Sequence, residues 1–455
     1  MFSILSTAHQ VARAMKIAII GGGISGLVAA YKLHSEHEIT LFEANDYPGG
    51  HTNTMEVESD GVRHAIDTGF IVFNDATYPN FIALLDELGV ESQATSMSFS
   101  VADRATGLEY GSSSLGSLFA QRGNMLNRSH WRMLADVLRF NRRAFAEAAT
   151  LDDEETVAEF CGRHRLSLEF VERYLYPMGS AIWSCPRGTF ADFPVRFIIE
   201  FFQNHGLLSL WNRPQWRVVS GGSRRYVDAL TRPFRERIML KTPVTRVNRI
   251  GDAVEIALSD GCVQTFDHVI FACHSDQALQ ILGDDATAVE RELLSAFPYQ
   301  SNVAVLHTDE TLLPRERRAW ASWNYRLVGH DAATVTYNLN ILQGIRAAKT
   351  FCVTLNDSGN IDSNAILRTI QYAHPVFTTQ RAAAQARRRE LIDERRTSFC
   401  GAYWRNGFHE DGVVSALEVV AALKDERRPT ARSAHSTRVA AVGRSEGRHP
   451  MERSR

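Results

Sequence analysis

Three glycines near the N-terminus have the spacing of a nucleotide-binding turn. Gly21, Gly23 and Gly26 form the pattern GxGxxG between an apolar run, 16–20, and a stretch with helical spacing, 24–33. In such a turn the glycines permit a tight bend, a close approach of the backbone to a pyrophosphate, and close packing of the helix on the sheet. The first amides of the helix lie at the positive end of its dipole. The spacing therefore predicts a diphosphate site.

An acidic residue stands at the far end of the same unit. Glu43 lies 17 residues after Gly26 and closes the run 38–43, which predicts a second, parallel strand. In a dinucleotide-binding unit, an acid near this distance accepts hydrogen bonds from the adenosine ribose. Strand, glycines, helix, strand and acid together predict a site for the ADP half of a dinucleotide. They do not choose between a nicotinamide and a flavin.

A second group of glycines follows the acid. Gly49 and Gly50 form a pair, which either makes an ordinary turn or lets the backbone pass close to a flat or charged group. The runs 54–59 and 62–67 alternate in polarity around an Asp-Gly turn, which predicts a hairpin closed by residues 67–70.

With the glycine pair behind the acid, the chain resembles the FAD-dependent family of amine oxidases, phytoene desaturases and protoporphyrinogen oxidases. The resemblance implies FAD as the cofactor. It also implies an α/β fold, with a Rossmann-like FAD-binding domain of the glutathione-reductase type in the amine oxidase topology and an inserted α+β substrate domain. The family usually has Arg after the glycine pair, where this chain has His51.

The C-terminal part carries a second glycine-bearing motif. An apolar strand ends at Gly401, and a helix is expected to begin near Gly412 with acids just before it. In the resembled family this helix start faces the pyrimidine edge of the flavin, where its dipole stabilises the negative charge of the reduced ring. The residue pattern of 401–412 resembles that of one branch of the family, the flavoproteins found beside or fused to cyclopropane-fatty-acyl-phospholipid synthases. The segments 337–343 and 374–377 resemble the same branch. The similarity covers about 16–423.

The resemblance implies contacts to the cofactor from several separate segments. The residues are Gly21, Gly23, Ile24, Ser25, Gly26, Glu43, Ala44, Gly49, Gly50, His51, Thr68, Gly69, Phe70, Val244, Ala272, Gly401, Ala402, Asp411, Gly412 and Val413. Among them, the backbone of Val244 is expected to pair with the adenine edge.

Length and motif order predict a discontinuous organisation. The FAD-binding domain is expected to comprise 16–77, 216–288 and 397–424, the substrate domain 78–215 and 289–396, and the ends 1–15 and 425–455 are expected to be disordered. The net charge of −2 gives no reason to expect nucleic acid as a partner. Six cysteines without a CxxC motif favour reduced thiols in a cytoplasm, and no metal site is expected.

The substrate domain is expected to contain helices over 78–216 and sheet strands within 289–397. The most apolar stretch, 193–211, predicts a buried helix ended by Gly206. The alternatives are a wall of an apolar tunnel and a surface that inserts into a lipid interface. The charged run 381–396 is interpreted as a solvated face. The expected strands include three residues whose side chains could form the floor of the active site, Tyr337, Asn338 or Asn340. The alternative is that they are ordinary sheet positions.

The candidate catalytic residues are His409, Glu410, Tyr337 and Asn338. His409 and Glu410 are expected either to transfer protons beside the flavin or to hold the turn. Amine oxidases of the resembled superfamily commonly use a lysine-held water and an aromatic cage. Here only Lys349 of the lysines falls in the substrate domain, and Phe408 stands where a cage tyrosine is expected.

An apolar substrate therefore suits the chain better than an amine. The leading hypothesis is hydride transfer between the flavin and a fatty acyl chain of a lipid, with a cyclopropane-fatty-acid-synthase-like methyltransferase as a partner. The alternatives are a flavin amine oxidase and a flavin-binding scaffold for the methyltransferase. The expected location is the cytoplasm, with peripheral contact at the inner face of the membrane.

Overall fold

The computed structural model describes most of the chain. The described residues are 14–152, 154–183, 187–208, 213–328, 332–357, 359–376, 378 and 380–425. The ends predicted to be disordered fall almost wholly outside these ranges, although Asp425 is the last residue of a helix. Within the described ranges, no helix has both the length and the apolar character needed to cross a bilayer.

A five-stranded parallel sheet forms around the N-terminal unit. β1 (Lys16–Ile20), α1 (Ile24–Leu33) and β2 (Glu38–Phe42) match the predicted bounds to within one residue. The sheet order is β10-β2-β1-β14-β20, and its other strands are β10 (Ile238–Met239), β14 (His268–Phe271) and β20 (Thr397–Phe399). Because the carboxyl ends of parallel strands meet at one edge, the loops after β1, β14 and β20 converge there.

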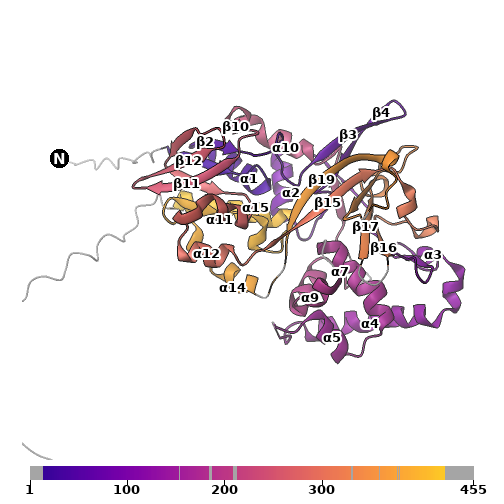
Figure 1. Ribbon diagram of the computed structural model, residues 1–455. Coiled ribbons are helices and arrows are strands. Elements are labelled where there is room, and N and C mark those ends of the chain that lie inside the picture. Colours follow the sequence, from indigo (N-terminus) through magenta and orange to yellow (C-terminus); the bar gives the residue numbers. More distant parts are fainter. Residues whose placement is uncertain are drawn as a thin grey trace, which may run out of the picture.

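Helices cover one face of this sheet, and an antiparallel layer with two further helices covers the other (Figure 1). The first set is α1, α2 (Pro79–Leu88), α10 (Arg224–Thr231) and α15 (His409–Asp425). The second is β11 (Val244–Ile250), β12 (Ala253–Leu258), β13 (Val263–Phe266), α11 (Ser275–Leu282) and α12 (Ala288–Leu294). Ile17 and Ile19 pack against the first set, whereas Ala18 and Ile20 face the second. Burial on both faces explains why β1 is apolar at every residue from Ile17 to Ile20.

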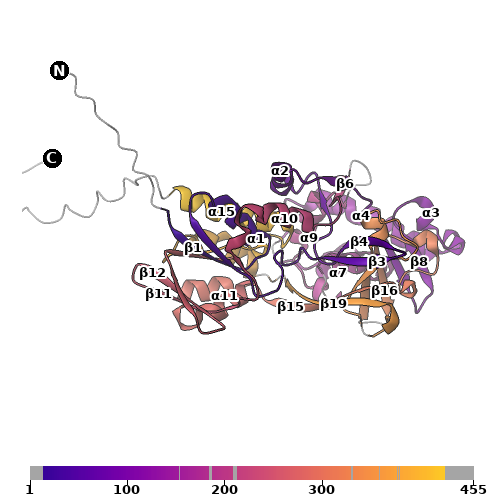
Figure 2. The same ribbon diagram turned by 90° about the horizontal axis from the view of Figure 1, so that it is seen from above.

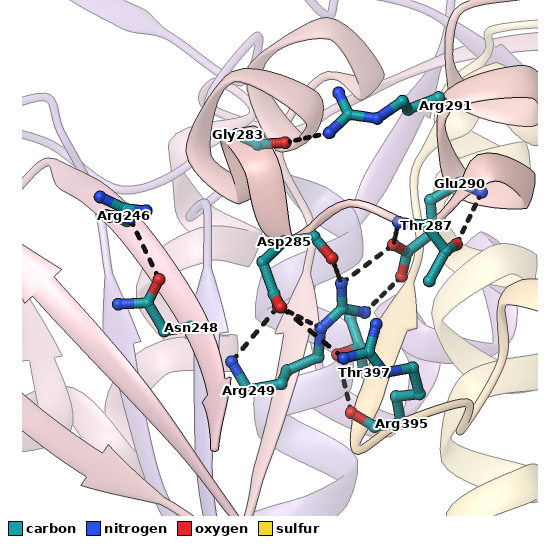
Figure 3. A network of polar contacts seen from close by, with 10 residues as sticks. All are labelled: Arg246, Asn248, Arg249, Gly283, Asp285, Thr287, Glu290, Arg291, Arg395 and Thr397. Carbon is teal, nitrogen blue, oxygen red and sulfur yellow. Dashed lines mark hydrogen bonds and ion pairs between the residues drawn. The ribbon is translucent and has the colours of Figure 1, made fainter.

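One buried arginine ties the antiparallel layer to its surroundings. The guanidinium of Arg249, on β11, forms ion pairs with Asp285 and Glu290 (Figure 3). Asp285 also pairs with Arg395, which stands just before β20. The network therefore fixes the layer against α12 and against the segment that leads into the sheet edge.

The second region is built on a seven-stranded sheet of order β19-β15-β18-β17-β16-β7-β8. Its strands are β7 (Phe99–Asp103), β8 (Leu108–Gly111), β15 (Tyr299–His307), β16 (Trp323–Val328), β17 (Ala332–Asn338), β18 (Cys352–Leu355) and β19 (Ile366–Pro375). The predicted runs within 289–397 correspond to β15, β17 and β18. Figure 2 shows the paired strands β15 and β19 running between the two regions.

The predicted hairpin is present as β3 (Thr54–Ser59) and β4 (Val62–Asp67). Asp60 and Gly61, its turn residues, both have positive φ, as a two-residue hairpin turn requires. A small sheet of order β5-β9-β6 lies after it, formed by β5 (Phe73–Asn74), β6 (Ser92–Ala94) and β9 (Trp216–Val219).

The expectation of helices throughout 78–216 is wrong at β6, β7 and β8. β7 is buried at every residue and pairs in parallel with β16, which comes much later in the chain. This pairing, which no local pattern reveals, decides its conformation. The helices of this part are α3 (Leu115–Leu118), α4 (Arg128–Glu147), α5 (Val157–Arg163), α6 (Leu168–Phe170), α7 (Tyr176–Trp183), α8 (Arg187–Ala191) and α9 (Val195–Asn204); α13 (Leu339–Leu342) and α14 (Gln380–Ala386) come later.

Two helical segments of this part need separate description. The helix that begins at α6 continues through a π-helical turn over Val171–Leu175 directly into α7, whose first turn contains Pro177. The buried helix α9 is present and is followed by Gly206 at φ +65°, as predicted; residues 209–211 of that apolar stretch lie outside the described ranges.

The charged run 381–396 is not wholly a solvated face. Arg381 and Arg388 are buried, and Arg388 bonds Glu418 and the backbone of Ser415. Ser223 stands at the N-cap position of α10, but its hydroxyl donates to Asp67 and does not bond the helix start.

Candidate functional site

A cavity of about 1070 Å³ opens at the carboxyl edge of the parallel sheet and continues into the second region. On the sheet side it is lined by residues after β1, β2, β14 and β20. On the other side it is lined by Tyr174, Met178, Ile182, Trp183, Phe201, His205, Leu207, Arg213, Trp216, Trp323, Tyr337 and Leu355. The loops that carry the predicted nucleotide motifs and the apolar side chains of the second region thus share one space.

The glycines of the first turn are required for different reasons. A Cβ on Gly21 would lie 2.8 Å from the Ala272 carbonyl oxygen, and one on Gly26 would lie 1.9 Å from that of Gly21. Both glycines are therefore required by packing. A Cβ on Gly23 would meet nothing within 4 Å, because this residue faces the cavity. Ile24 and Ser25, in the first turn of α1, also line the cavity, so the helix start faces open space that suits a diphosphate.

Glu43 is held beside this turn. Its carboxylate accepts hydrogen bonds from the Gly22 amide at 2.7 Å and the Asn45 amide at 2.8 Å. A carboxylate can accept about four hydrogen bonds, so acceptor capacity remains for ribose hydroxyls. Ala44 and Val244 line the cavity nearby, which suits an adenosine on this side.

The glycine pair packs directly on the first turn. The Gly49 amide donates to the Gly22 carbonyl at 2.8 Å, and a Cβ on Gly50 would lie 3.2 Å from the Gly23 Cα. The next residue, His51, lines the cavity. Burial, with a smaller effect of His274, lowers the pKa of His51 to about 4. A neutral imidazole therefore stands where the resembled family has a permanently charged arginine.

The residues after the hairpin form the next part of the wall. Thr68 donates its hydroxyl hydrogen to the Asn53 carbonyl, and a Cβ on Gly69 would lie 2.2 Å from the His51 carbonyl oxygen. The Phe70 ring stacks on His409, with centroids 3.7 Å apart. All three predicted residues, Thr68, Gly69 and Phe70, line the cavity.

Asp67 anchors this segment. Its carboxylate accepts hydrogen bonds from Thr54, Gln343 and both the amide and hydroxyl of Ser223. Burial raises the pKa of Asp67 to about 6 against these hydrogen bonds.

The last motif is shifted from its predicted position. Gly401 and Ala402 line the cavity, but α15 begins at His409 and not near Gly412. The Gly412 amide already donates to the Phe408 carbonyl, and a Cβ on Gly412 would lie 2.6 Å from Ile24. Gly412 therefore permits close contact between α1 and α15. The free amides of α15 lie in the turn that starts at His409.

Two neighbours of Gly412 also pack behind the cavity wall. The Asp411 carboxylate accepts from the Asn406 and Phe408 amides, and burial raises its pKa to about 6. Val413 is buried in the core beneath α1. Neither arrangement directs the side chain to the cavity.

Of the candidate catalytic residues, the structure brings His409 and Tyr337 to the cavity. His409 is held by a 2.7 Å hydrogen bond between its Nε2 and the Tyr226 hydroxyl, and burial lowers its pKa to about 3. Glu410 points elsewhere and accepts hydrogen bonds from the Asn80 and Phe81 amides at the start of α2.

Asn338 and Asn340 also have structural partners, and Asn340 is not a sheet position as expected, because it lies in α13. Asn338 caps α13 by accepting from the Ile341 amide. Asn340 donates to the Lys349 carbonyl and accepts from the Phe351 amide. Glu410 and these asparagines hold elements in place.

Three histidines of the wall were not predicted as site residues. His274 and His374 lie near His51, and the His374 Nδ1 accepts from Asn302 at 2.7 Å. His205 follows α9 in the apolar wall. No spacing in the sequence relates these residues, because the fold alone brings them together.

A flavin adenine dinucleotide fits this arrangement. The open space at Gly23, the spare acceptor capacity of Glu43 and the helix starts at Ile24 and His409 all face the same cavity. The α1 and α15 helices are in direct contact, since the Ser25 hydroxyl donates to the Gly412 carbonyl at 3.0 Å. Two dipoles are thus directed at one ligand.

Two solved structures have a fold similar to that of this chain. Cyclohexylamine oxidase from Brevibacterium oxydans IH-35A superposes with a TM-score of 0.64 at 16% identity, covering 91% of this chain and 99% of that one. A CLA-producing fatty acid isomerase from P. acnes gives 0.63 at 14% identity, with 90% and 98% covered. The predicted α/β fold is confirmed by these likenesses and by the parallel sheet.

Sequence relatives match over shorter lengths. A 4,4'-diapophytoene desaturase from Staphylococcus aureus (strain MRSA252) is 39% identical over 62 residues, which are 13% of this chain and 12% of that protein. The chain thus spans about an eighth of the length of this curated relative. By contrast, the model of the family described as flavin containing amine oxidoreductase matches residues 24–337 of this chain. The chain belongs to the flavin containing amine oxidoreductase family.

Proposed function

We propose that this oxidoreductase transfers hydride between FAD and a fatty acyl chain of a lipid. The supporting observation is the chemistry of the cavity beyond the cofactor motifs. Its wall there is formed mainly by aromatic and aliphatic side chains, among them Met178, Trp183 and Phe201. Burial of an acyl chain against such a wall is favourable, at roughly 0.8 kcal/mol per CH₂ group.

The charges of the wall point the same way. Among the described lining residues, Glu43 is the acidic side chain and Arg213 the permanently basic one. Glu43 belongs to the nucleotide side, so the substrate part offers no carboxylate to a cationic amine. Arg213 is exposed where the cavity meets the surface, and its charge suits the anionic head of an amphiphile.

FAD, when bound, supplies the hydride acceptor or donor. The residues of this chain contribute binding and orientation. The apolar wall excludes water and places the acyl chain, while the helix starts at Ile24 and His409 favour negative charge on the cofactor. His409 and Tyr226 hold the start of α15 in position through their hydrogen bond.

Likeness to other proteins adds support without deciding the substrate. The fatty acid isomerase from P. acnes shares the fold, and the staphylococcal desaturase is similar over 62 residues. Amine oxidation is the second candidate, because cyclohexylamine oxidase has the same fold and Phe408 and Trp216 offer aromatic rings to a neutral amine.

We also propose a cyclopropane-fatty-acid-synthase-like methyltransferase as a partner, for which the flavoprotein could serve as a scaffold. A further proposal is peripheral contact with the membrane.

The test is chemical analysis of the acyl chains. FAD-loaded protein is incubated with vesicles of dioleoyl phosphatidylglycerol, and the chains are released and analysed by mass spectrometry. We expect products that differ from oleoyl chains by two hydrogen atoms. Unchanged chains, together with ammonia and peroxide from added amines, would instead establish the second candidate. The scaffold alternative predicts that methyltransferase activity survives mutation of a flavin contact but is lost when the whole protein is removed.

A further inference from the structure

One imidazole stands in the apolar wall of the cavity. His205 directly follows α9, lines the cavity and is 6% exposed. Its Nδ1 lies 2.9 Å from the Phe201 carbonyl oxygen. A carbonyl oxygen can only accept a hydrogen bond, so Nδ1 must carry the hydrogen. In the neutral ring, Nε2 is therefore the atom with the free lone pair.

The surroundings of His205 keep this lone pair in an apolar setting. The ring stacks on Phe201, with centroids 3.8 Å apart, and lies 5.5 Å from the ring of Phe408 and 6.1 Å from that of Trp216. Burial lowers the pKa of His205 to about 4, against the opposing effect of the Phe201 carbonyl. The imidazole is therefore neutral near pH 7, with its Nε2 lone pair unprotonated, and is a weaker base than a solvated imidazole.

His205 is also close to the start of α15. Phe408 immediately precedes His409, the first residue of that helix, and stacks on Phe201 with centroids 4.9 Å apart. The wall that carries His205 thus abuts the helix start that faces the cofactor. A substrate between this wall and the flavin would contact both.

The other imidazoles of the cavity are placed differently. The Nε2 of His409 is bonded to Tyr226, and the Nδ1 of His374 to Asn302. His51 and His274 lie on the cofactor side, beside the glycine pair and after β14. His374 lies on β19 of the second region but packs beside His51, so among the described lining residues His205 is the imidazole that stands among the rings of Phe201, Trp216 and Phe408.

We infer that His205 exchanges the proton of the reaction, an inference that rests on the proposed function. In dehydrogenation, one C–H bond of the acyl chain breaks with its electron pair, which passes as hydride to oxidised FAD. The C–H bond of the neighbouring carbon breaks heterolytically, its proton goes to the His205 Nε2, and its electron pair forms the C=C bond. In the reverse direction the imidazolium returns the proton.

The test compares two histidine-to-glutamine variants of the FAD-loaded protein. His205→Gln keeps a neutral polar side chain but removes the proton acceptor. His307→Gln is the matched control, because His307 is also buried and has a pKa lowered to about 4. It stands at the far end of β15 from Tyr299 and Ser301, which line the cavity, and is not itself a lining residue. Flavin absorbance is followed in single turnovers with dioleoyl phosphatidylglycerol vesicles.

We expect H205Q to bind FAD normally and to slow flavin reduction by about 10²- to 10⁴-fold, the usual contribution of a positioned acid or base. H307Q should react like the wild type. Free imidazole should restore part of the rate to His205→Ala, which a purely structural role of His205 would not allow.

A second measurement does not depend on turnover. In the cofactor-free protein, ¹⁵N NMR of the histidine rings should show the Nδ1–H tautomer for His205, identified by its absence from H205Q. The Nε2–H tautomer would overturn the inference, as would H205Q with the wild-type rate of flavin reduction. A wild-type protein whose flavin no lipid reduces or reoxidises would instead refute the proposed function, and this inference with it.

Discussion

At the scale of single residues, two glycines of one motif have different roles. Gly26 has no room for a side chain, because a Cβ there would lie 1.9 Å from the Gly21 carbonyl oxygen. Gly23 has extended backbone and open space, and that space belongs to the cavity. The fold therefore needs Gly26, and the ligand needs Gly23.

Gly23→Ala should fold like the wild type but bind FAD at least about tenfold more weakly, a loss of about 1.4 kcal/mol, because the methyl group occupies the diphosphate space. Flavin fluorescence titration gives the dissociation constant, and thermal unfolding checks the fold. Gly162→Ala is the control, since a Cβ there also meets nothing within 4 Å but lies on α5. Wild-type affinity in G23A would contradict the placement of the diphosphate.

Glu43→Gln should also weaken FAD binding by about tenfold, since a hydrogen bond to a charged group contributes about 1.5–3 kcal/mol. The carboxylate is held by the Gly22 and Asn45 amides, and an amide side chain cannot accept from both with the same strength. Asp46→Asn, at an exposed neighbouring acid, should leave the dissociation constant unchanged. Equal effects of the two variants would mean that local charge, not the ribose contact, is being measured.

At the scale of elements, Glu410 joins α15 to α2. Its carboxylate accepts from the Asn80 and Phe81 amides and from the Asn80 side chain. These are donors of the first turn of α2, which otherwise have no partner in the helix. Glu410 was expected either to transfer protons or to hold the turn, and its contacts are those of a cap between two helices.

Glu410→Ala should lower the free energy of unfolding by about 2–3 kcal/mol, because it leaves buried donors unsatisfied. Urea denaturation measures this loss, while the flavin spectrum and the rate of flavin reduction should be preserved. Glu87→Ala, also on α2, removes an exposed ion pair with Lys32 and should cost less than about 1 kcal/mol. Loss of flavin reduction in folded E410A would restore a catalytic role to Glu410.

Local elements could be predicted well, and distant pairings could not. The hairpin of β3 and β4 needs only alternation and an Asp-Gly turn, and its bounds follow from the sequence. β7 depends on pairing with β16, far away in sequence, which no local pattern predicts. The glycine motifs likewise predict residues that line the cavity. His205 and His374 could not be recognised as wall residues, because only tertiary packing brings them there.

At the scale of the whole molecule, the cavity concentrates buried imidazoles. Burial lowers the pKa of His51, His205 and His274 to about 4, and that of His374 and His409 to about 3. In the unfolded chain a histidine has a pKa of about 6.5. At pH values between the folded and the unfolded pKa, the unfolded state therefore binds more protons than the folded state.

The cofactor-free protein should lose stability as the pH falls from about 6.5 toward 4, by up to about 1.4 kcal/mol per pH unit for each such histidine. The stability is fully present above the unfolded pKa and is lost as the pH approaches the folded one. Urea unfolding at pH 7, 6 and 5 measures the slope, and His374→Gln should make it shallower. A flat profile would show that the imidazoles are solvated.

The proposed function requires one cavity that holds both the flavin and an acyl chain. The most direct measurement is anaerobic spectroscopy of the FAD-loaded protein with dioleoyl phosphatidylglycerol vesicles. We expect lipid to bleach the yellow oxidised flavin, or to return colour to a photoreduced sample, according to the direction of the reaction. A flavin whose absorbance responds to lipid in neither state, while amines reduce it, would contradict the proposed function.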